Sequence, residues 1–163
     1  MATSTSIIDR SSELELLALL GEGSFGAVYK AKQKSSGAIV AVKVIPYSAS
    51  NGMEGDDVET NKIMSEIDIL SKCKSPYIVG YYECFLKEIS RRIDSREMWI
   101  VMEYCESGSM SDLVDHRGLH SYPEGEEVIR AVCASIVLGL EYLHGAANVC
   151  HRDIKCGNGT NCE

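Results

Sequence analysis

Short apolar runs separated by tight turns dominate the first third of the chain. The turns are indicated by a glycine cluster at residues 21–26 and by Ser35-Ser36-Gly37. Strands that follow one another at such short spacing form an antiparallel sheet rather than units in which strands alternate with helices. The strands predicted here are Leu14–Leu20, Ala27–Lys32 and Ile39–Ile45, the last of which is closed by Pro46.

A helical period follows at about Val58–Lys72. Its apolar residues recur three or four positions apart, as they do on one face of a helix: Ile63, Ile67 and Leu70. Two further strands are predicted at Ile78–Leu86 and Met98–Tyr104. The segment between them, residues 87–97, is so highly charged that we expect a solvated loop.

The last third of the chain favours helices. Ser107-Gly108-Ser109 interrupts the strand pattern, and a short helix is expected to open at Asp112. A long helix is predicted from Pro123 to His144, because proline and then acidic residues suit a first helical turn. Apolar residues occupy nearly all of its faces, so this helix needs burial on most sides. If its apolar surface stays exposed, we expect aggregation or a protein partner that covers it.

The bulk composition narrows the function classes. The 163 residues suffice for one domain, and the net charge of −8 argues against a nucleic-acid binder, which needs a basic face. No apolar run is long enough to span a membrane, and the polar residues 1–12 are expected to be disordered rather than a secretory signal. A zinc site at Cys150, Cys156 and Cys162 with His144 and His151 is disfavoured, because their spacing does not match C-x-x-C. The odd number of cysteines, seven, indicates free thiols in a reducing, cytoplasmic setting.

The glycine cluster carries the first candidate chemistry. It has the form G-x-G-x-x-G, and a backbone without Cβ atoms can close over phosphates and donate its N–H groups. On its own, this pattern fits an ordinary hairpin turn as well as it fits a phosphate-binding loop. The dinucleotide-binding version must open a helix. Here the glycines lead into Ala27-Val28-Tyr29, which is strand-like and argues against that version.

Three more signals follow in a fixed order: the strand Val40-Ala41-Val42-Lys43, a helical Glu66, and the segment HRDIKCGN at residues 151–158. Together with the glycines they resemble a eukaryotic protein kinase, including the spacing between Asp153 and Asn158. Several stretches are similar in wording to the sterile-twenty-like serine/threonine kinases of the Hippo-type branch: LGEGSFGAVYKA, SPYIVGYYECF, WIVMEYCESGSMSDL and GLEYLH.

The resemblance implies an α+β, protein-kinase-like fold, truncated within its large lobe. Residues 13–163 would form the incomplete domain. The small lobe, a five-stranded antiparallel sheet with one main helix, would occupy residues 13–102. The hinge would follow at residues 103–108. The first helices of the large lobe and the catalytic loop would lie within residues 109–163.

The resemblance also implies that the protein binds ATP and Mg²⁺ and acts on protein substrates. Val28 and Ala41 would pack on the adenine ring, Met102 would guard the back of the pocket, and two hinge residues would offer backbone groups to the base. Asp112 suits a contact to the ribose and a helix cap equally well. The residues expected to bind ATP are Leu20, Gly21, Glu22, Gly23, Ser24, Phe25, Gly26, Val28, Ala41, Lys43, Met102, Glu103, Cys105 and Asp112.

Lys43 would contact the α- and β-phosphates while it is paired with Glu66. A lysine inside an apolar strand needs a partner even without catalysis, because an unpaired charge is costly to desolvate. Glu59 and Asp68 are nearby alternatives, but the place of Glu66 among apolar residues favours it.

In the catalytic loop, Asp153 would accept the proton of a substrate hydroxyl. Lys155 would stabilise the transferring phosphoryl group, and lysine at this position resembles the serine/threonine class. Asn158 would hold one magnesium ion, while His151 and Arg152 would serve as scaffold.

The sequence departs from the kinase pattern after Asn158, where Gly159-Thr160-Asn161-Cys162-Glu163 replaces an apolar strand. The 163 residues contain no D-F-G or A-P-E motif. Two hypotheses follow. The chain is an incomplete ATP-dependent serine/threonine kinase of signal transduction, inactive alone, or it is a non-catalytic nucleotide- or partner-binding fragment. Intact Lys43, Glu66, Asp153 and Asn158 favour the first.

Overall fold

The computed structural model describes residues 9–23, 26–48, 56–90, 95–117 and 125–159. The chain divides into two compact units. The first unit comprises residues 1–71 and 81–104, and the second unit comprises residues 72–80 and 105–163.

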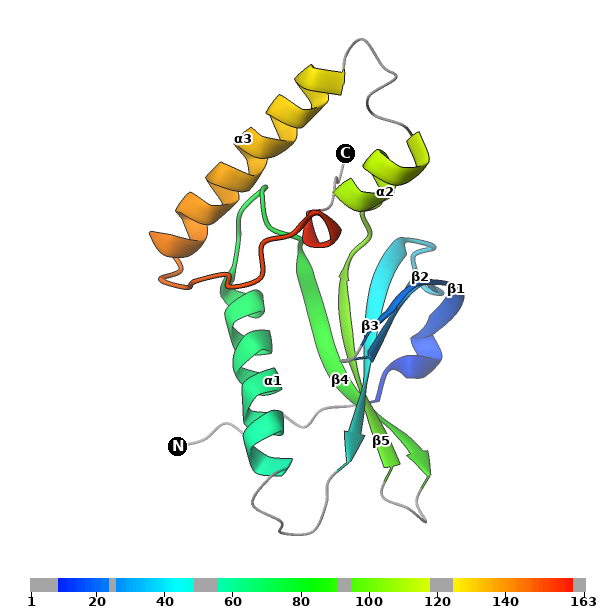
Figure 1. The fold of residues 1–163 in the computed structure, drawn as a ribbon. Helices are drawn as coiled ribbons and strands as arrows, with labels where there is room; N and C mark the ends of the chain where they lie inside the picture. Colours follow the sequence, from blue (N-terminus) through cyan, green and yellow to red (C-terminus); the bar gives the residue numbers. More distant parts are fainter. Residues whose placement is uncertain (1–8, 24–25, 49–55, 91–94, 118–124, 160–163) are drawn as a thin grey trace. The chain divides into compact units, whose positions relative to one another are not determined.

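The first unit contains a five-stranded antiparallel sheet in the order β1-β2-β3-β5-β4, with helix α1 alongside it (Figure 1). A short 3₁₀ helix, Ser11–Glu13, precedes the first strand. This architecture confirms the predicted α+β fold. The elements are β1 (Leu14–Gly23), β2 (Gly26–Gln33), β3 (Ile39–Ser48), α1 (Asp56–Lys72), β4 (Tyr81–Ser90) and β5 (Ser95–Glu103).

The sheet is buried on both faces because its central strands alternate between two apolar clusters. Along β5, Trp99 and Val101 belong to one cluster, whereas Met98 and Ile100 belong to the other. The second cluster also contains Ile67 of α1, so we call its side of the sheet the helix face. Burial on two faces explains why β5 reads as a continuous apolar run rather than as an alternation.

The predicted end of β3 at Pro46 is wrong, because β3 continues to Ser48. The pairing of β3 with β2 stops at Val44, and only β5 accompanies it beyond that point, with Pro46 opposite Glu97. A proline lacks the N–H group of a sheet ladder, but a strand with one free side tolerates that loss.

The charged segment expected to be a loop at residues 87–97 is instead largely a hairpin. Strand β4 extends to Ser90, β5 begins at Ser95, and residues 91–94 lie outside the described residues. Lys87 stands opposite Glu97 in the register, with Nζ 3.8 Å from Oε2. Opposite charges across two strands are favourable, so charge does not exclude a strand here.

The N-terminal residues expected to be disordered fall into two parts. Residues 1–8 lie outside the described residues. Arg10 lies 2.7 Å from Glu13 and 2.7 Å from Glu83, measured between guanidinium nitrogens and carboxylate oxygens. These ion pairs link the start of the described chain to β4.

The second unit contains helices α2 (Met110–Arg117) and α3 (Gly125–His144) and the 3₁₀ helix η3 (Cys156–Asn158). The predicted start of the long helix at Pro123 lies outside the described residues. Helix α3 packs against the segment before β4. There, the Lys74 N–H donates to the Tyr142 hydroxyl at 2.8 Å, and a Cβ at Gly139 would lie 3.1 Å from the Tyr77 carbonyl oxygen.

Much of the apolar surface of α3 is exposed, as the sequence predicted. Val137 is 63% exposed and Ile129 is 46% exposed, whereas Leu143 near the helix end is buried. None of the described helices is long and apolar enough to cross a membrane.

The expectation that all thiols are free is wrong for Cys105, which is disulfide-bonded. The free cysteines among the described residues are Cys73, Cys84, Cys133, Cys150 and Cys156.

Candidate functional site

The glycine cluster forms the connection between β1 and β2. Gly23 pairs with Gly26 across residues 24 and 25, and β2 begins directly at Gly26. Since a strand and not a helix follows the glycines, the structure excludes the dinucleotide-binding version of the motif. Leu20, Gly21 and Glu22 are exposed on β1, whereas Ser24 and Phe25 lie outside the described residues.

Strand register brings the other sequence-predicted nucleotide residues of the first unit onto one face. Val28 stands opposite Lys43, and Ala41 stands opposite Met102. Residues directly opposite each other in an antiparallel ladder share a face. Met102 packs against the second apolar cluster, so all four residues lie on the helix face of the sheet.

Lys43 is partly buried on this face, and its opposite neighbour on β5 is buried Ile100. Glu66 lies on α1, the helix that packs on the same face through Ile67. Glu66 itself is exposed, and among the described ion pairs none joins it to Lys43. The structure thus places both residues on the same side of the sheet without the ion pair that the sequence predicts.

Glu103 ends β5 and stands opposite Val40, and the disulfide-bonded Cys105 follows two residues later in the second unit. The role that the resemblance implies for Glu103 and Cys105 uses main-chain atoms, so it does not depend on the side chain or on the disulfide. Both would serve a bound base through main-chain atoms.

Asp112 caps helix α2. Its Oδ2 atom accepts hydrogen bonds from the Ser109 N–H at 2.7 Å and from the Ser109 hydroxyl at 2.6 Å, and the Asp112 N–H is 3.2 Å from the Ser109 Oγ. This reciprocal pattern is a capping box. Of the two roles that the sequence left open, the structure shows the cap.

The catalytic-loop residues converge on one carboxylate. The Lys155 ammonium lies 2.9 Å from Asp153 Oδ2. The Asn158 amide donates to the same oxygen at 2.9 Å and to the Asp153 backbone carbonyl at 2.8 Å. His151 accepts the Asp153 N–H through Nδ1 at 3.3 Å. The sequence spacing therefore brings Asp153, Lys155 and Asn158 into contact.

Two features of the second unit support this loop. Arg152 has a positive φ of 63°, which turns the chain sharply before Asp153. The Met110 N–H donates to the Gly159 carbonyl at 2.8 Å and so ties the end of the loop to the start of α2.

The environment of Asp153 favours its ionised form. The hydrogen bond from Lys155, and then that from Asn158, lower the pKa of the Asp153 carboxyl below its ordinary value. The carboxylate is therefore held as an acceptor at neutral pH. A charged oxygen next to a lysine ammonium and an amide can orient a hydroxyl group and receive its proton.

The chain belongs to the protein kinase family, because the family model described as a protein kinase domain matches residues 14–158. Within that family it groups with sterile-twenty-like serine/threonine kinases, as the sequence predicted.

Two relatives illustrate this placement. The chain is 41% identical over 152 residues to Serine/threonine-protein kinase 4 homolog B of Dictyostelium discoideum, covering 93% of this chain and 12% of the relative. It is 40% identical over 144 residues to Serine/threonine-protein kinase cst-1 of Caenorhabditis briggsae, covering 88% of this chain and 25% of the relative. The chain thus spans a quarter or less of the length of these relatives.

Proposed function

We propose that this sequence contains the N-terminal part of the kinase domain of an ATP-dependent serine/threonine protein kinase, which transfers the γ-phosphoryl group of ATP to protein hydroxyls. One observation carries the proposal: the Lys155 ammonium and the Asn158 amide each lie 2.9 Å from the same Asp153 carboxylate oxygen. Protein kinases use an aspartate and an asparagine at this spacing for the substrate hydroxyl and for a metal ion.

In the first unit, the helix face would receive the nucleotide. Val28 and Ala41 are small apolar residues on that face, and they would cover adenine without filling its space. Lys43 would donate to the α- and β-phosphates, and Glu66 would orient its ammonium after a shift of α1 or of either side chain.

In the second unit, Asp153 would orient the substrate hydroxyl and take its proton. Lys155 would neutralise charge on the phosphoryl group as it moves, and its contact with Asp153 favours the ionised carboxylate. Phosphoryl transfer needs mostly positioning and charge stabilisation, and these two side chains supply both.

Mg²⁺ would neutralise the phosphate oxygens when it is bound. Asn158 fits such an ion, because its amide nitrogen donates to Asp153 and its Oδ1 atom is left to coordinate a cation. Among the described residues there is no group of three or more His, Cys, Asp and Glu side chains that could hold a metal by themselves. An Asn158 site therefore needs ligands from ATP and from a further protein segment.

The proposal is tested by nucleotide binding to the purified 163-residue chain. We expect weak, magnesium-dependent binding of a fluorescent ATP analogue, because Val28, Ala41 and Lys43, which would hold adenine and the phosphates, all lie on the first unit. Lys43→Ala is expected to weaken it by about tenfold or more, since charge-assisted contacts to phosphate are lost. A bulky change, Ala41→Phe, is expected to block the adenine position. Binding that survives both substitutions would place the nucleotide elsewhere.

Exposed apolar residues on α3 favour a second role, as a surface that a protein partner covers. Val137 and Ile129 lie on a helix of the second unit and are largely exposed. A patch of this kind on a soluble domain marks a contact surface or promotes aggregation.

This second role predicts that Val137→Lys raises the monomeric fraction of the purified chain, because a charge opposes association through an apolar surface. Ser135→Lys is the matched control, since it adds the same charge on an exposed position of the same helix. Light scattering coupled to size-exclusion chromatography measures both. Equal effects of the two substitutions would assign the change to net charge and not to the apolar face.

A further inference from the structure

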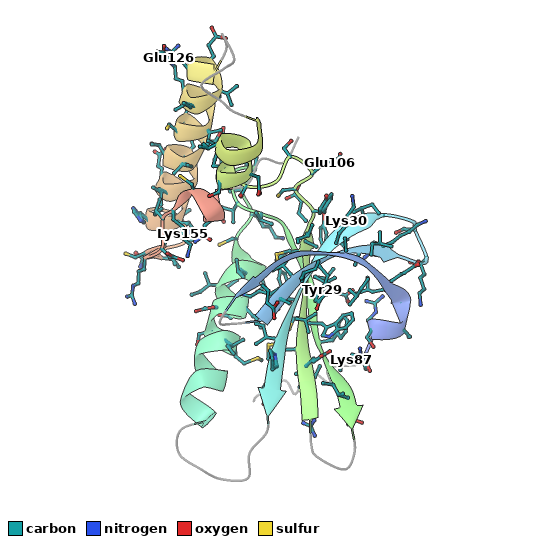
Figure 2. The ribbon with its side chains drawn as sticks, turned by 45° about the vertical axis from the view of Figure 1, so that its right-hand side comes forward. Tyr29, Lys30, Lys87, Glu106, Glu126 and Lys155 are labelled. Carbon is teal, nitrogen blue, oxygen red and sulfur yellow. The ribbon has the colours of Figure 1, made fainter. Side chains whose placement is uncertain are left out.

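Lys30 lies on β2, two residues beyond Val28, and its side chain is labelled in Figure 2. In the register it stands opposite Ala41, so it belongs to the helix face with the proposed nucleotide residues. Its ammonium lies 4.4 Å from the centre of the Tyr104 ring. That distance is well inside the range of a cation–π interaction.

Tyr104 occupies a special point of the chain. It follows Glu103, which is the last residue of β5 and the last one paired to β3. Ladder hydrogen bonds therefore hold the backbone up to Glu103, and the side chain of Tyr104 makes the next attachment. The backbone on either side of Tyr104 is the part of the hinge that would read the edge of adenine.

The contact also joins β2 to the residue that follows β5, and β2 and β5 are not neighbours. Strand β3 separates β2 from β5 in the sheet. Lys30 on β2 thus meets Tyr104 although β3 lies between their strands, and the residue opposite Lys30 on β3 is the small Ala41. An aliphatic stem that lies on apolar surface and ends in a charge over a ring is a stable arrangement.

A second cation on the helix face would otherwise compete with Lys43. The two lysines lie on adjacent strands of the same face, and both are partly buried. Among the described residues no carboxylate lies within ion-pair distance of Lys30. The Tyr104 ring therefore supplies the attraction that holds the Lys30 charge beside the hinge, away from the phosphates that Lys43 would bind.

We infer that Lys30 is a positioning residue that clamps the start of the hinge through Tyr104, fixing the backbone of residues 103 and 104 against the strand that carries Val28. This inference rests on the proposed function for its effect on ATP, but the clamp itself is a property of the first unit. It assigns a role in nucleotide affinity to a side chain that does not touch phosphate.

Lys30→Met tests the clamp, because methionine keeps much of the stem and removes the charge. In amide hydrogen exchange without nucleotide, we expect faster exchange in peptides that cover residues 102–106, and an equal effect from Tyr104→Leu. With a fluorescent ATP analogue, we expect Lys30→Met to bind about three- to tenfold more weakly. Lys30→Arg, which keeps a cation over the ring, is expected to restore both readouts.

Lys32→Met is the matched control. Lys32 lies on the same strand and is exposed, and its substitution removes the same charge. It should change neither readout. A structural role alone would raise exchange throughout the sheet and lower the melting temperature, and that result would overturn the inference. So would unchanged hinge exchange in Lys30→Met, or a Lys30→Arg variant as defective as Lys30→Met.

The two readouts separate this inference from the proposed function. If the unaltered chain binds no nucleotide while Lys30→Met still loosens the hinge alone, the proposed function fails and the clamp stands. If the unaltered chain binds ATP in a Lys43-dependent way while Lys30→Met changes neither readout, the clamp fails and the proposed function stands.

Discussion

Asp153→Asn is expected to lower the rate of phosphoryl transfer by about 10²- to 10⁴-fold in a complete kinase domain that carries this sequence. Asparagine has nearly the same shape as aspartate but cannot take a proton from a hydroxyl group. It also removes the charge that Lys155 faces at 2.9 Å. The contact from the Asn158 amide to the backbone carbonyl of residue 153 would remain, so the loop should keep its course.

The measurement is steady-state kinetics with a peptide substrate, on residues 1–158 joined to the rest of the kinase domain of the Dictyostelium relative. We expect kcat to fall while KM for ATP changes little, because Asp153 acts on the hydroxyl and not on the nucleotide. The 163 residues alone serve as a negative control, since they contain Asn158 but no D-F-G motif, whose aspartate holds magnesium in protein kinases. Magnesium-dependent phosphorylation by that chain, abolished by Lys43→Ala, would contradict the expectation that the 163 residues are inactive alone.

Glu126→Gln is a matched control for the loss of a carboxylate in the second unit. Glu126 pairs with Arg130 at 3.0 Å on the exposed side of α3, and such surface pairs contribute about 0–1 kcal/mol. Activity should therefore stay close to that of the unaltered domain. If Asp153→Asn lost no more activity than Glu126→Gln, another group would have to accept the proton.

The sequence could indicate that Asp153, Lys155 and Asn158 lie close together, because the three residues fall within one short segment. In the structure, Lys155 and Asn158 both contact the Asp153 carboxylate. The sheet was equally predictable at β1, β2 and the start of β3, where apolar runs alternate with glycine turns. In both regions the local sequence and the tertiary structure favour the same backbone conformation.

The sequence failed where a distant neighbour decided the structure. Residues 87–97 read as a solvated loop because single-sequence patterns do not show that Lys87 will meet Glu97 across a hairpin. Pro46 read as a strand end because the sequence does not show that β3 has lost β2 as a neighbour at that point. The Lys43–Glu66 pair depends on the position of α1, and composition says nothing about that position.

Lys30 was missed for a related reason. Its alternation with Val28 on β2 could have placed it on the nucleotide face, and that signal was present in the sequence. Its ring partner, however, lies beyond the end of another strand, at Tyr104. Only the order of strands in the sheet brings the two together.

Gly26→Ala is expected to destabilise the first unit strongly, although family resemblance alone would treat it like the other two glycines of the motif. Gly26 has a φ of +119°, and a Cβ there would clash with the Val44 carbonyl oxygen and lie 3.1 Å from the Ile45 Cα. Backbone strain of about 1–3 kcal/mol would be added to the cost of moving β3 away. We expect the melting temperature to fall by about 10 °C or more.

Gly23→Ala provides the matched comparison, because a Cβ at Gly23 would meet no heavy atom within 4 Å. Its melting temperature should therefore stay near that of the unaltered chain, while nucleotide binding weakens because the added methyl group faces the space that phosphates would occupy. Thermal unfolding and nucleotide titration of both variants decide the matter. Equal stability of the two variants would show that Gly26 serves the nucleotide alone. If Gly26→Ala loses stability and Gly23→Ala loses nucleotide binding, the motif combines two requirements. Gly26 is needed for the turn into β2, and Gly23 is needed for the close approach of the nucleotide.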